Sequence, residues 1–219
     1  MRHKIYNLDE RLKQFVSELP ERLPKKVNII DVYSAEENEK LIQYLASGAM
    51  CSRDTAICYL AFETGLRTVD ICKIKISDID WSRNNIHVVQ AKTGRELNLD
   101  LRASYGNAMA EYVLNDRPKT SSDTLFLGKD APYAPISSRV SYSILRNAAN
   151  GAGIDHKGRI YGTRFTRHNA ATRMLKKQIP IEDIAGVLGM FNSNSVMYYI
   201  TTEDEQLSKC TLPLPAVRR

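Results

Sequence analysis

Two arginines and a tyrosine that lie far apart in the chain are the residues best suited to catalysis. Arg67 ends the segment Thr64-Gly65-Leu66-Arg67, Arg167 stands just before His168, and Tyr199 lies near the C-terminus. An arginine holds a phosphate with two parallel N–H donors, and a tyrosine hydroxyl can attack phosphorus. Together these residue types predict a site that cleaves phosphodiester bonds, with DNA as the expected substrate.

The overall composition is that of an ordered globular protein with a basic surface. The chain has 219 residues, of which 43% are hydrophobic and 26% charged, so it can bury a full core. Its formal net charge of +6 favours a polyanionic partner, because phosphate contacts dominate nucleic-acid affinity. Charge alone is weak evidence, since many basic proteins bind no nucleic acid.

The cysteines and histidines form no metal-binding pattern. Cys51, Cys58, Cys72 and Cys210 make no C-x-x-C pair, and the four histidines are scattered along the chain. We therefore expect buried, reduced thiols, no metal and a cytoplasmic location. The N-terminus lacks an apolar signal core, and no apolar run has the length of a membrane span.

Helical segments are expected on both sides of Arg67. Residues 1–30 carry one amphipathic stretch and then two prolines, which indicates a helical appendage and linker. Ser34-Ala35-Glu36-Glu37 is a capping box that opens a helix, and Gly48 ends it. A second helix is expected from near Arg53 to Gly65, and a third helical run follows Arg67 as far as Ile74.

A β-hairpin is expected next, with Lys92 at its tip. Its arms are residues 86–90 and 96–101, and Thr93-Gly94 supplies the tight turn. Further helices are expected at about 103–115, 136–151, 164–177, 181–188 and 193–200. Pro180 and Gly189 bracket the fourth of these, and the last residues form an extended tail.

Five landmarks in one order resemble the tyrosine recombinase (phage integrase) family: Thr64-Gly65-Leu66-Arg67 with Asp70, Ala91-Lys92-Thr93-Gly94-Arg95, Arg164 to His168, Leu188-Gly189-Met190, and Tyr199. The resemblance covers about residues 35–202, the whole catalytic domain of that family. It implies a mostly helical α+β fold with a small antiparallel β-sheet. We therefore expect residues 1–30 to be the appendage and 31–219 to be an integrase-type catalytic domain with a C-terminal tail.

The implied activity is site-specific DNA recombination through a 3′-phosphotyrosyl intermediate, without metal, cofactor or ATP. In these roles Arg67 and Arg167 stabilise the transition state, Arg164 contacts the phosphate, Lys92 protonates the departing 5′-oxygen and Tyr199 is the nucleophile. Further DNA contacts are expected from Arg95, His168 and Arg173, and Asp70 is expected to orient the site. Taken singly, each arginine is better explained as a solvated side chain and Lys92 as a polar turn residue, and His168 could equally contact phosphate or cap local structure.

Three positions leave alternatives open. Tyr199 lies nine residues after Met190, as the family's nucleophile does after its landmark, but Tyr198 also competes for the role. Arg164 replaces the usual histidine, and an arginine cannot act as a base near neutral pH. Met190 stands where the family has a histidine or tryptophan donor, so either it leaves a phosphate oxygen without a donor or it is a packing residue.

The expected partners are double-stranded DNA and further copies of the chain, which would be a monomer when free and form dimers to tetramers on DNA, with no membrane. Only about 30 residues precede the expected catalytic domain, whereas longer family members carry a DNA-clamping domain there. Relaxation of DNA like that of a type IB topoisomerase and non-catalytic DNA binding are the alternative functions. The DNA target sequence cannot be read from these residues, because phosphate contacts carry no sequence information.

Overall fold

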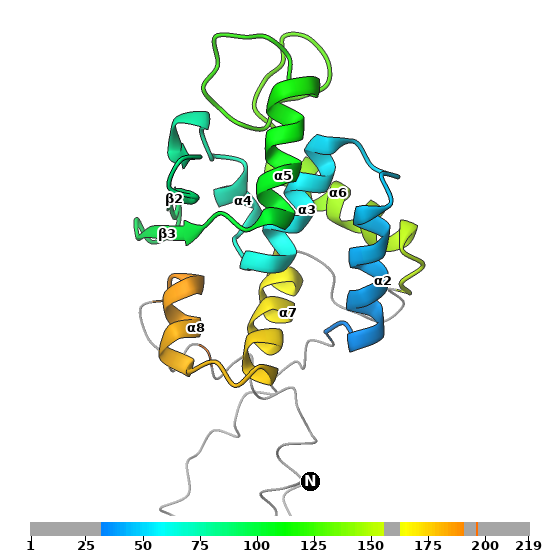
Figure 1. Ribbon diagram of the computed structural model, residues 1–219, viewed down its shortest axis with the longest axis vertical. Coiled ribbons are helices and arrows are strands. Elements are labelled where there is room, and N and C mark those ends of the chain that lie inside the picture. The colour runs from blue at the N-terminus through cyan, green and yellow to red at the C-terminus, as the bar shows by residue number, and fades with distance from the viewer. Residues whose placement is uncertain (1–31, 156–162, 191–195, 197–219) are drawn as a thin grey trace, which may run out of the picture.

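The computed structural model describes residues 32–155, 163–190 and 196. Helices dominate it, and one small antiparallel sheet lies to the side of them (Figure 1). The α+β class expected from the sequence is therefore confirmed. In chain order the elements are α2 (Ala35–Ala46), α3 (Ser52–Thr64), α4 (Thr68–Ile71), a 3₁₀ turn (Ile76–Asp78), β1 (Ile79–Asp80), β2 (Asn85–Val89), β3 (Glu96–Asp100), α5 (Ala103–Glu111), a π-helical turn (Tyr112–Asp116), α6 (Ser138–Gly151), α7 (Thr163–Lys176) and α8 (Ile181–Leu188).

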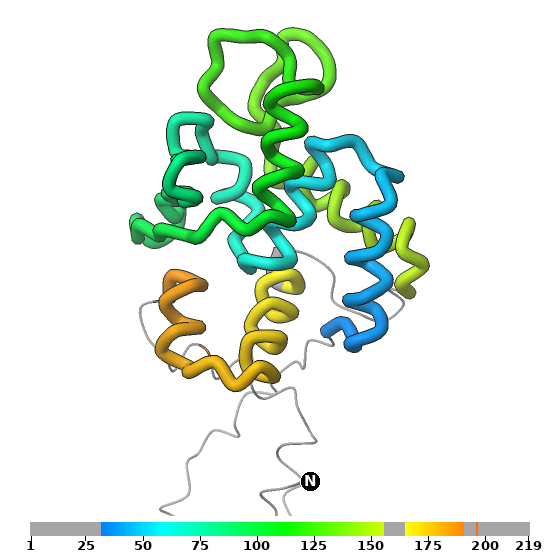
Figure 2. Tube along the Cα trace, in the orientation of Figure 1, coloured from blue at the N-terminus to red at the C-terminus, as the bar shows by residue number. Residues whose placement is uncertain are grey.

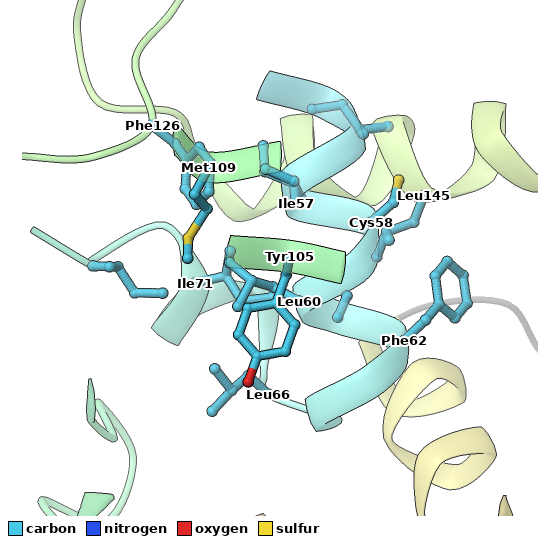
Figure 3. Close-up of a cluster of buried hydrophobic side chains, with 14 of the residues drawn as sticks. Ile57, Cys58, Leu60, Phe62, Leu66, Ile71, Tyr105, Met109, Phe126 and Leu145 are labelled. Carbon is cyan, nitrogen blue, oxygen red and sulfur yellow. The ribbon is translucent and has the colours of Figure 1, made fainter. Parts of the chain in front are cut away.

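Helix α3 forms the centre of the main hydrophobic core. Ile57 and Leu60 on this helix are fully buried and face Tyr105 and Met109 of α5 (Figure 3). Helices α2, α6 and α7 also pack against α3. Burying one such large aliphatic side chain contributes about 1.5–3 kcal/mol, so α3 holds most of the other helices in place.

The local signals at the ends of α2 and α3 act as the sequence predicted. Ser34 accepts a hydrogen bond from the Glu37 amide at 3.1 Å, and the Glu37 carboxylate accepts one from the Ser34 amide at 2.8 Å. This capping box satisfies two N–H groups that the first turn of α2 leaves without helical partners. Gly65 ends α3 in the left-handed conformation, with φ of +66°.

The hairpin is part of a three-stranded sheet in the order β1-β2-β3. Residues in β2 and β3 pair antiparallel, with His87 opposite Asn98. The inward-facing side chains are Ile86, Val88, Leu97 and Leu99, whereas Val89 is exposed. The two-residue strand β1 was not expected. Helix α4 ends at Ile71, short of the expected Ile74, because the Ile74 carbonyl accepts a hydrogen bond from the Leu125 amide at 2.8 Å instead of continuing the helix.

The long connection between α5 and α6 forms the end of the molecule opposite α7 and α8 (Figure 2). Arg117 holds it in place by donating to the carbonyls of Ser122, Thr124 and Leu125. The helix expected over 103–115 is a nine-residue α-helix that widens into a π-helical turn through Asp116.

Two separate hydrophobic clusters are present among the described residues. The larger surrounds α3, and the smaller lies between α7 and α8. The smaller cluster consists of Ala171, Ile184, Ala185, Leu188, Met190 and Val196. Helix α8 has the predicted bounds, with Pro180 before it and Gly189 after it.

The cysteine expectation is correct at two positions and wrong at one. Cys58 and Cys72 are buried free thiols, and burial raises the pKa of both. Cys51 is exposed; it precedes α3 and is not one of the helical residues that pack in the core. In the described segments no helix has the length and apolar character needed to cross a membrane. The expected helices at 1–30 and 193–200, and Cys210, lie outside the described residues, with Val196 the one exception.

Candidate active site

Gly65 allows the end of α3 to approach α7 and α8 very closely. A Cβ atom at this position would lie 2.8 Å from Leu188 Cδ2 and 2.9 Å from Ala170 Cβ, so no larger residue fits. Its left-handed φ also favours glycine. Two residues later Arg67 precedes the first turn of α4, and its side chain is 24% exposed. The Thr-Gly-Leu-Arg motif therefore places an arginine at the junction of three helices.

Arg167 approaches the same junction from α7. It is only 4% exposed. Its Nη1 atom donates to the Gly65 carbonyl at 3.4 Å, and its Nη2 atom donates to the Leu188 carbonyl at the end of α8. These bonds bring Arg167 next to the segment that carries Arg67, although the two arginines lie about a hundred residues apart in sequence.

Gln90 links the two arginines, and the sequence analysis did not identify it. Its Nε2 atom donates to the Leu188 carbonyl at 3.0 Å, and its Oε1 atom accepts from Arg67 Nη1 at 3.1 Å. The residue is fully buried. We call Arg67, Gln90, Arg167 and the carbonyl of Leu188 the polar joint, because this group connects the hairpin and α4 to α7 and α8.

The alternation along β2 could have revealed Gln90. Ile86 and Val88 face inward, so the next inward position after them is residue 90. A polar side chain at an inward-facing position must find hydrogen-bond partners, because an unpaired buried amide is costly. Gln90 was therefore recognisable as a residue with buried polar contacts, although not as a partner of the arginines.

Asp70 contacts both Arg67 and the hairpin. Its Oδ1 atom accepts a hydrogen bond from the Ala91 amide at 2.8 Å, and its Oδ2 atom lies 3.8 Å from Arg67 Nη1. The residue is 1% exposed. This geometry suits the orienting role predicted for Asp70, because one carboxylate restrains the arginine and the base of the turn that carries Lys92.

The tip of the hairpin presents Lys92 to solvent. Lys92 itself is exposed, and the hydroxyl of its neighbour Thr93 donates to Gln90 Oε1 at 2.9 Å. Arg95, on the other side of the turn, donates from Nη1 to the Met190 carbonyl at 2.5 Å. The Arg95 bond holds the tip over the end of α8, which lies beneath the hairpin in Figure 1.

The Leu188-Gly189-Met190 landmark has a packing explanation. Gly189 has φ of +62°, and a Cβ atom there would lie 2.4 Å from Gln90 Nε2. The Met190 side chain is 9% exposed and belongs to the smaller hydrophobic cluster. These contacts favour the packing role that the sequence left open for Met190.

The other expected site residues are less closely connected to the polar joint. His168 is half-buried on α7 directly after Arg167. Arg173 donates to the Phe62 carbonyl at 3.3 Å and lines a cavity of about 250 Å³ together with Arg102 and Lys177. Arg164 lies in the first turn of α7, but its side chain is outside the described part of the chain, as are Tyr198, Tyr199 and residues 192–194.

The described site is suited to binding and activating a phosphodiester. It brings two guanidinium groups to one junction and sets an ammonium group on the adjacent turn, and such cations stabilise the charge that develops on a phosphate in the transition state. Within the described segments no cluster of three or more histidine, cysteine, aspartate or glutamate residues could hold a metal ion.

Comparison with known sequences finds a matching family model and relatives described as integrases or recombinases. The model of the phage integrase family matches residues 32–206. One relative in Sinorhizobium fredii, y4gC, is described as an integrase/recombinase; it is 33% identical over 74% of this chain and 83% of its own length. A second protein of that organism, y4rF, has the same description and is 30% identical over 78% of this chain. The chain spans only 40% of the length of y4rF.

Solved structures share the fold. XerH site-specific recombinase bound to a palindromic difH substrate matches 84% of this chain with a TM-score of 0.70 and 18% identity, over 53% of its own chain. A lambda integrase dimer bound to a COC′ core site matches 84% of this chain with a TM-score of 0.62 and 22% identity, over 63% of its own chain.

Proposed function

The chain belongs to the phage integrase family, and on this premise we propose that it is a tyrosine recombinase that cleaves and rejoins DNA. The observation that carries the proposal is the polar joint, in which Arg67 and Arg167 meet through the carbonyl of Leu188 and the side chain of Gln90. Two arginines fixed at one place are suited to binding one scissile phosphate.

In the proposed reaction the Tyr199 oxygen attacks the phosphorus and the bond to the 5′-oxygen breaks. Tyr199 loses its hydroxyl proton to solvent, and Lys92 gives a proton to the departing 5′-oxygen. A 3′-phosphotyrosyl bond results, and attack by a 5′-hydroxyl reverses the step. The arginines stabilise the extra charge of the transition state, a role worth about 2.7–4 kcal/mol for one such donor.

We propose double-stranded DNA as the substrate and assembly into dimers or tetramers on it. The net charge of +6 and the exposed Lys92 support the DNA partner. The lambda integrase that shares the fold is a dimer on its core site, which supports assembly on DNA. The cytoplasmic location, the division at residue 31 and the roles of Arg95, Arg164, His168 and Arg173 stay predictions.

Trapping the covalent intermediate tests the proposal. The protein is incubated with duplexes from its native locus that are nicked next to each candidate cleavage position, so that a short leaving strand diffuses away. Denaturing electrophoresis should then show a protein–DNA adduct. Tyr199→Phe should abolish the adduct, and Tyr198→Phe is the matched control that should retain it.

The outcomes separate the alternatives. An adduct that maps to Tyr198 would overturn the nucleophile assignment. An adduct with relaxed plasmid but no recombinant product would indicate a topoisomerase, and DNA binding with no adduct at any nick would leave a binding protein.

A further inference from the structure

Gln90 is a buried polar residue that the proposed reaction does not itself use. Its side chain makes three hydrogen bonds, to the Leu188 carbonyl, Arg67 and the Thr93 hydroxyl. Its backbone amide donates to the Arg95 carbonyl at 2.9 Å, and its carbonyl accepts from the Gly94 amide at 2.8 Å. The residue is fully buried, so its carboxamide has one fixed orientation.

The three side-chain partners of Gln90 belong to three different parts of the proposed site. Arg67 is one of the two phosphate-binding arginines. The Leu188 carbonyl is shared with Arg167, the other arginine. Thr93 directly follows Lys92 in the turn. A displacement of this single carboxamide would therefore displace the groups that bind the phosphate and the group that protonates the leaving oxygen.

The glutamine side chain fits this set of contacts. The position needs a donor toward the Leu188 carbonyl and an acceptor toward Arg67 and Thr93, which a neutral amide supplies at its two ends. A carboxylate would face the Leu188 carbonyl with no hydrogen to donate, and its charge would offset that of Arg67. An ammonium or guanidinium would repel Arg67, and asparagine is one methylene shorter.

We propose that Gln90 is a positioning residue, which sets the spacing of Arg67 and Arg167 and orients the turn that carries Lys92. The proposal rests on the proposed recombinase activity of the same site. It predicts that the loss of Gln90 acts on the rate of the chemical step through the arginines. A shift of about 1 Å in a reacting group can cost about a hundredfold in rate.

The first test is Gln90→Met, which keeps the length of the side chain and removes its hydrogen bonds. Single-turnover adduct formation at saturating DNA should fall by about tenfold to a hundredfold. In a protein that already carries Arg67→Ala, the same change should cost less than it does in the wild type, because the part of its effect that runs through Arg67 is already lost. A wild-type rate in the folded Gln90→Met protein, or fully multiplicative losses in the double variant, would overturn the proposal.

A matched control is available in another buried amide. Asn169 is fully buried on α7, and its Nδ2 atom donates to Asn38 Oδ1 at 2.8 Å, away from the polar joint. Asn169→Ala should lower stability toward urea but leave the adduct rate per folded molecule within about twofold. An equal loss of rate in both variants would show that any damaged buried amide has this effect, against a positioning role.

A second variant covers the possibility that Gln90→Met does not fold. Thr93→Val keeps the shape of a half-buried side chain and removes the donor to Gln90 Oε1. It should slow adduct formation on an ordinary substrate by about threefold to tenfold. A substrate whose 5′-bridging oxygen is sulfur needs little protonation, so on it the variant should match the wild type. Equal defects on both substrates would contradict an effect on Lys92.

An NMR measurement without DNA separates this proposal from the proposed function. The guanidinium N–H signal of Arg67 should indicate a restrained group in the wild type and a freely moving one in Gln90→Met. An unchanged signal overturns the positioning role, whether or not the wild-type protein forms an adduct. A lost restraint in a protein that forms no adduct supports the positioning of Arg67 and refutes the recombinase activity alone.

Discussion

The main core around α3 and the polar joint beside it consist of opposite kinds of group, although both are buried apart from the half-buried Arg67. Ile57, Leu60 and their neighbours in the core are apolar and exchangeable in principle for residues of similar volume. The polar joint consists of two arginines, an amide and a carbonyl, each of which has a directional partner. Directional bonds tolerate much smaller changes of geometry than apolar contacts do.

The difference indicates that the main core determines the stability of the fold, whereas the polar joint and the hairpin tip determine the rate of the reaction. Removal of a core side chain should weaken the whole fold and leave the chemistry of each folded molecule intact. Removal of a group at the joint or the hairpin tip should act on the reaction. Four tests of this contrast follow, from the largest expected effect to the smallest.

Lys92→Ala should slow adduct formation strongly and leave the free energy of unfolding nearly unchanged. Lys92 is exposed, so its loss should leave the free energy of unfolding within about 0.5 kcal/mol of the wild type. Loss of a general acid should slow adduct formation by about a hundredfold to ten-thousandfold. The substrate with sulfur at the 5′-bridging position should restore most of the rate. Failure of that rescue would remove Lys92 from the general-acid role.

Arg167→Lys tests whether the fork geometry of the joint matters beyond its charge. Lysine keeps the positive charge but cannot donate to the Gly65 and Leu188 carbonyls and a phosphate from one planar group. Single-turnover cleavage should fall by about a hundredfold to a thousandfold. A lysine variant with near wild-type cleavage would show that charge alone is sufficient, and the contrast with the core would weaken.

Leu60→Ala tests whether the main core affects stability without affecting the reaction. Leu60 is fully buried in the main core, so its truncation should lower the free energy of unfolding by about 2–5 kcal/mol, as measured in urea. Leu114→Ala is the same change at a position that is 80% exposed, and it should cost less than about 0.5 kcal/mol. Adduct formation per folded molecule should be unchanged in both, and a slower rate in Leu60→Ala would link the core directly to the chemistry.

Gly189→Ala and Gly153→Ala compare equal backbone strain in different surroundings. Both glycines have left-handed φ angles, so backbone strain alone should cost each alanine about 1–2 kcal/mol of stability. A Cβ at Gly189 would collide with the Gln90 amide, whereas a Cβ at Gly153 would have nothing within 4 Å. Only the change at Gly189 should also slow adduct formation, and equal rates in the two variants would show that the contact with Gln90 has no effect on the joint.

The sequence predicted best the features that depend on local signals. The capping box at Ser34, the left-handed end of α3 at Gly65 and the bounds of α8 between Pro180 and Gly189 are all as expected. Each is determined by interactions within a few residues. The sequence did not predict where α4 ends, and it did not predict strand β1. The end of α4 depends on pairing of the residues near Ile74 with the distant segment near Leu125.

The candidate site also has residues that the sequence identified and contacts that only the tertiary fold determines. The motif order identified Arg67, Lys92, Asp70 and Arg167, and the structure brings these residues close to one junction. The motif order could not show that one glutamine connects these residues, since Gln90 meets Leu188 only through the tertiary fold. The cysteine expectation failed at Cys51 for a related reason: helical sequence indicates a helix, but the packing of neighbouring elements decides which side is covered.

The span of the joint along the chain also bears on the order in which the protein is made. Gln90 bonds to a carbonyl 98 residues further on, and Arg167 bonds back across 102 residues. Synthesis runs from the N-terminus, so Arg67, Gln90 and Lys92 emerge from the ribosome long before their partners. The joint can close only after Leu188 has been added. An interrupted product that ends before this point lacks the carbonyl that Gln90 and Arg167 share, so it cannot assemble the joint.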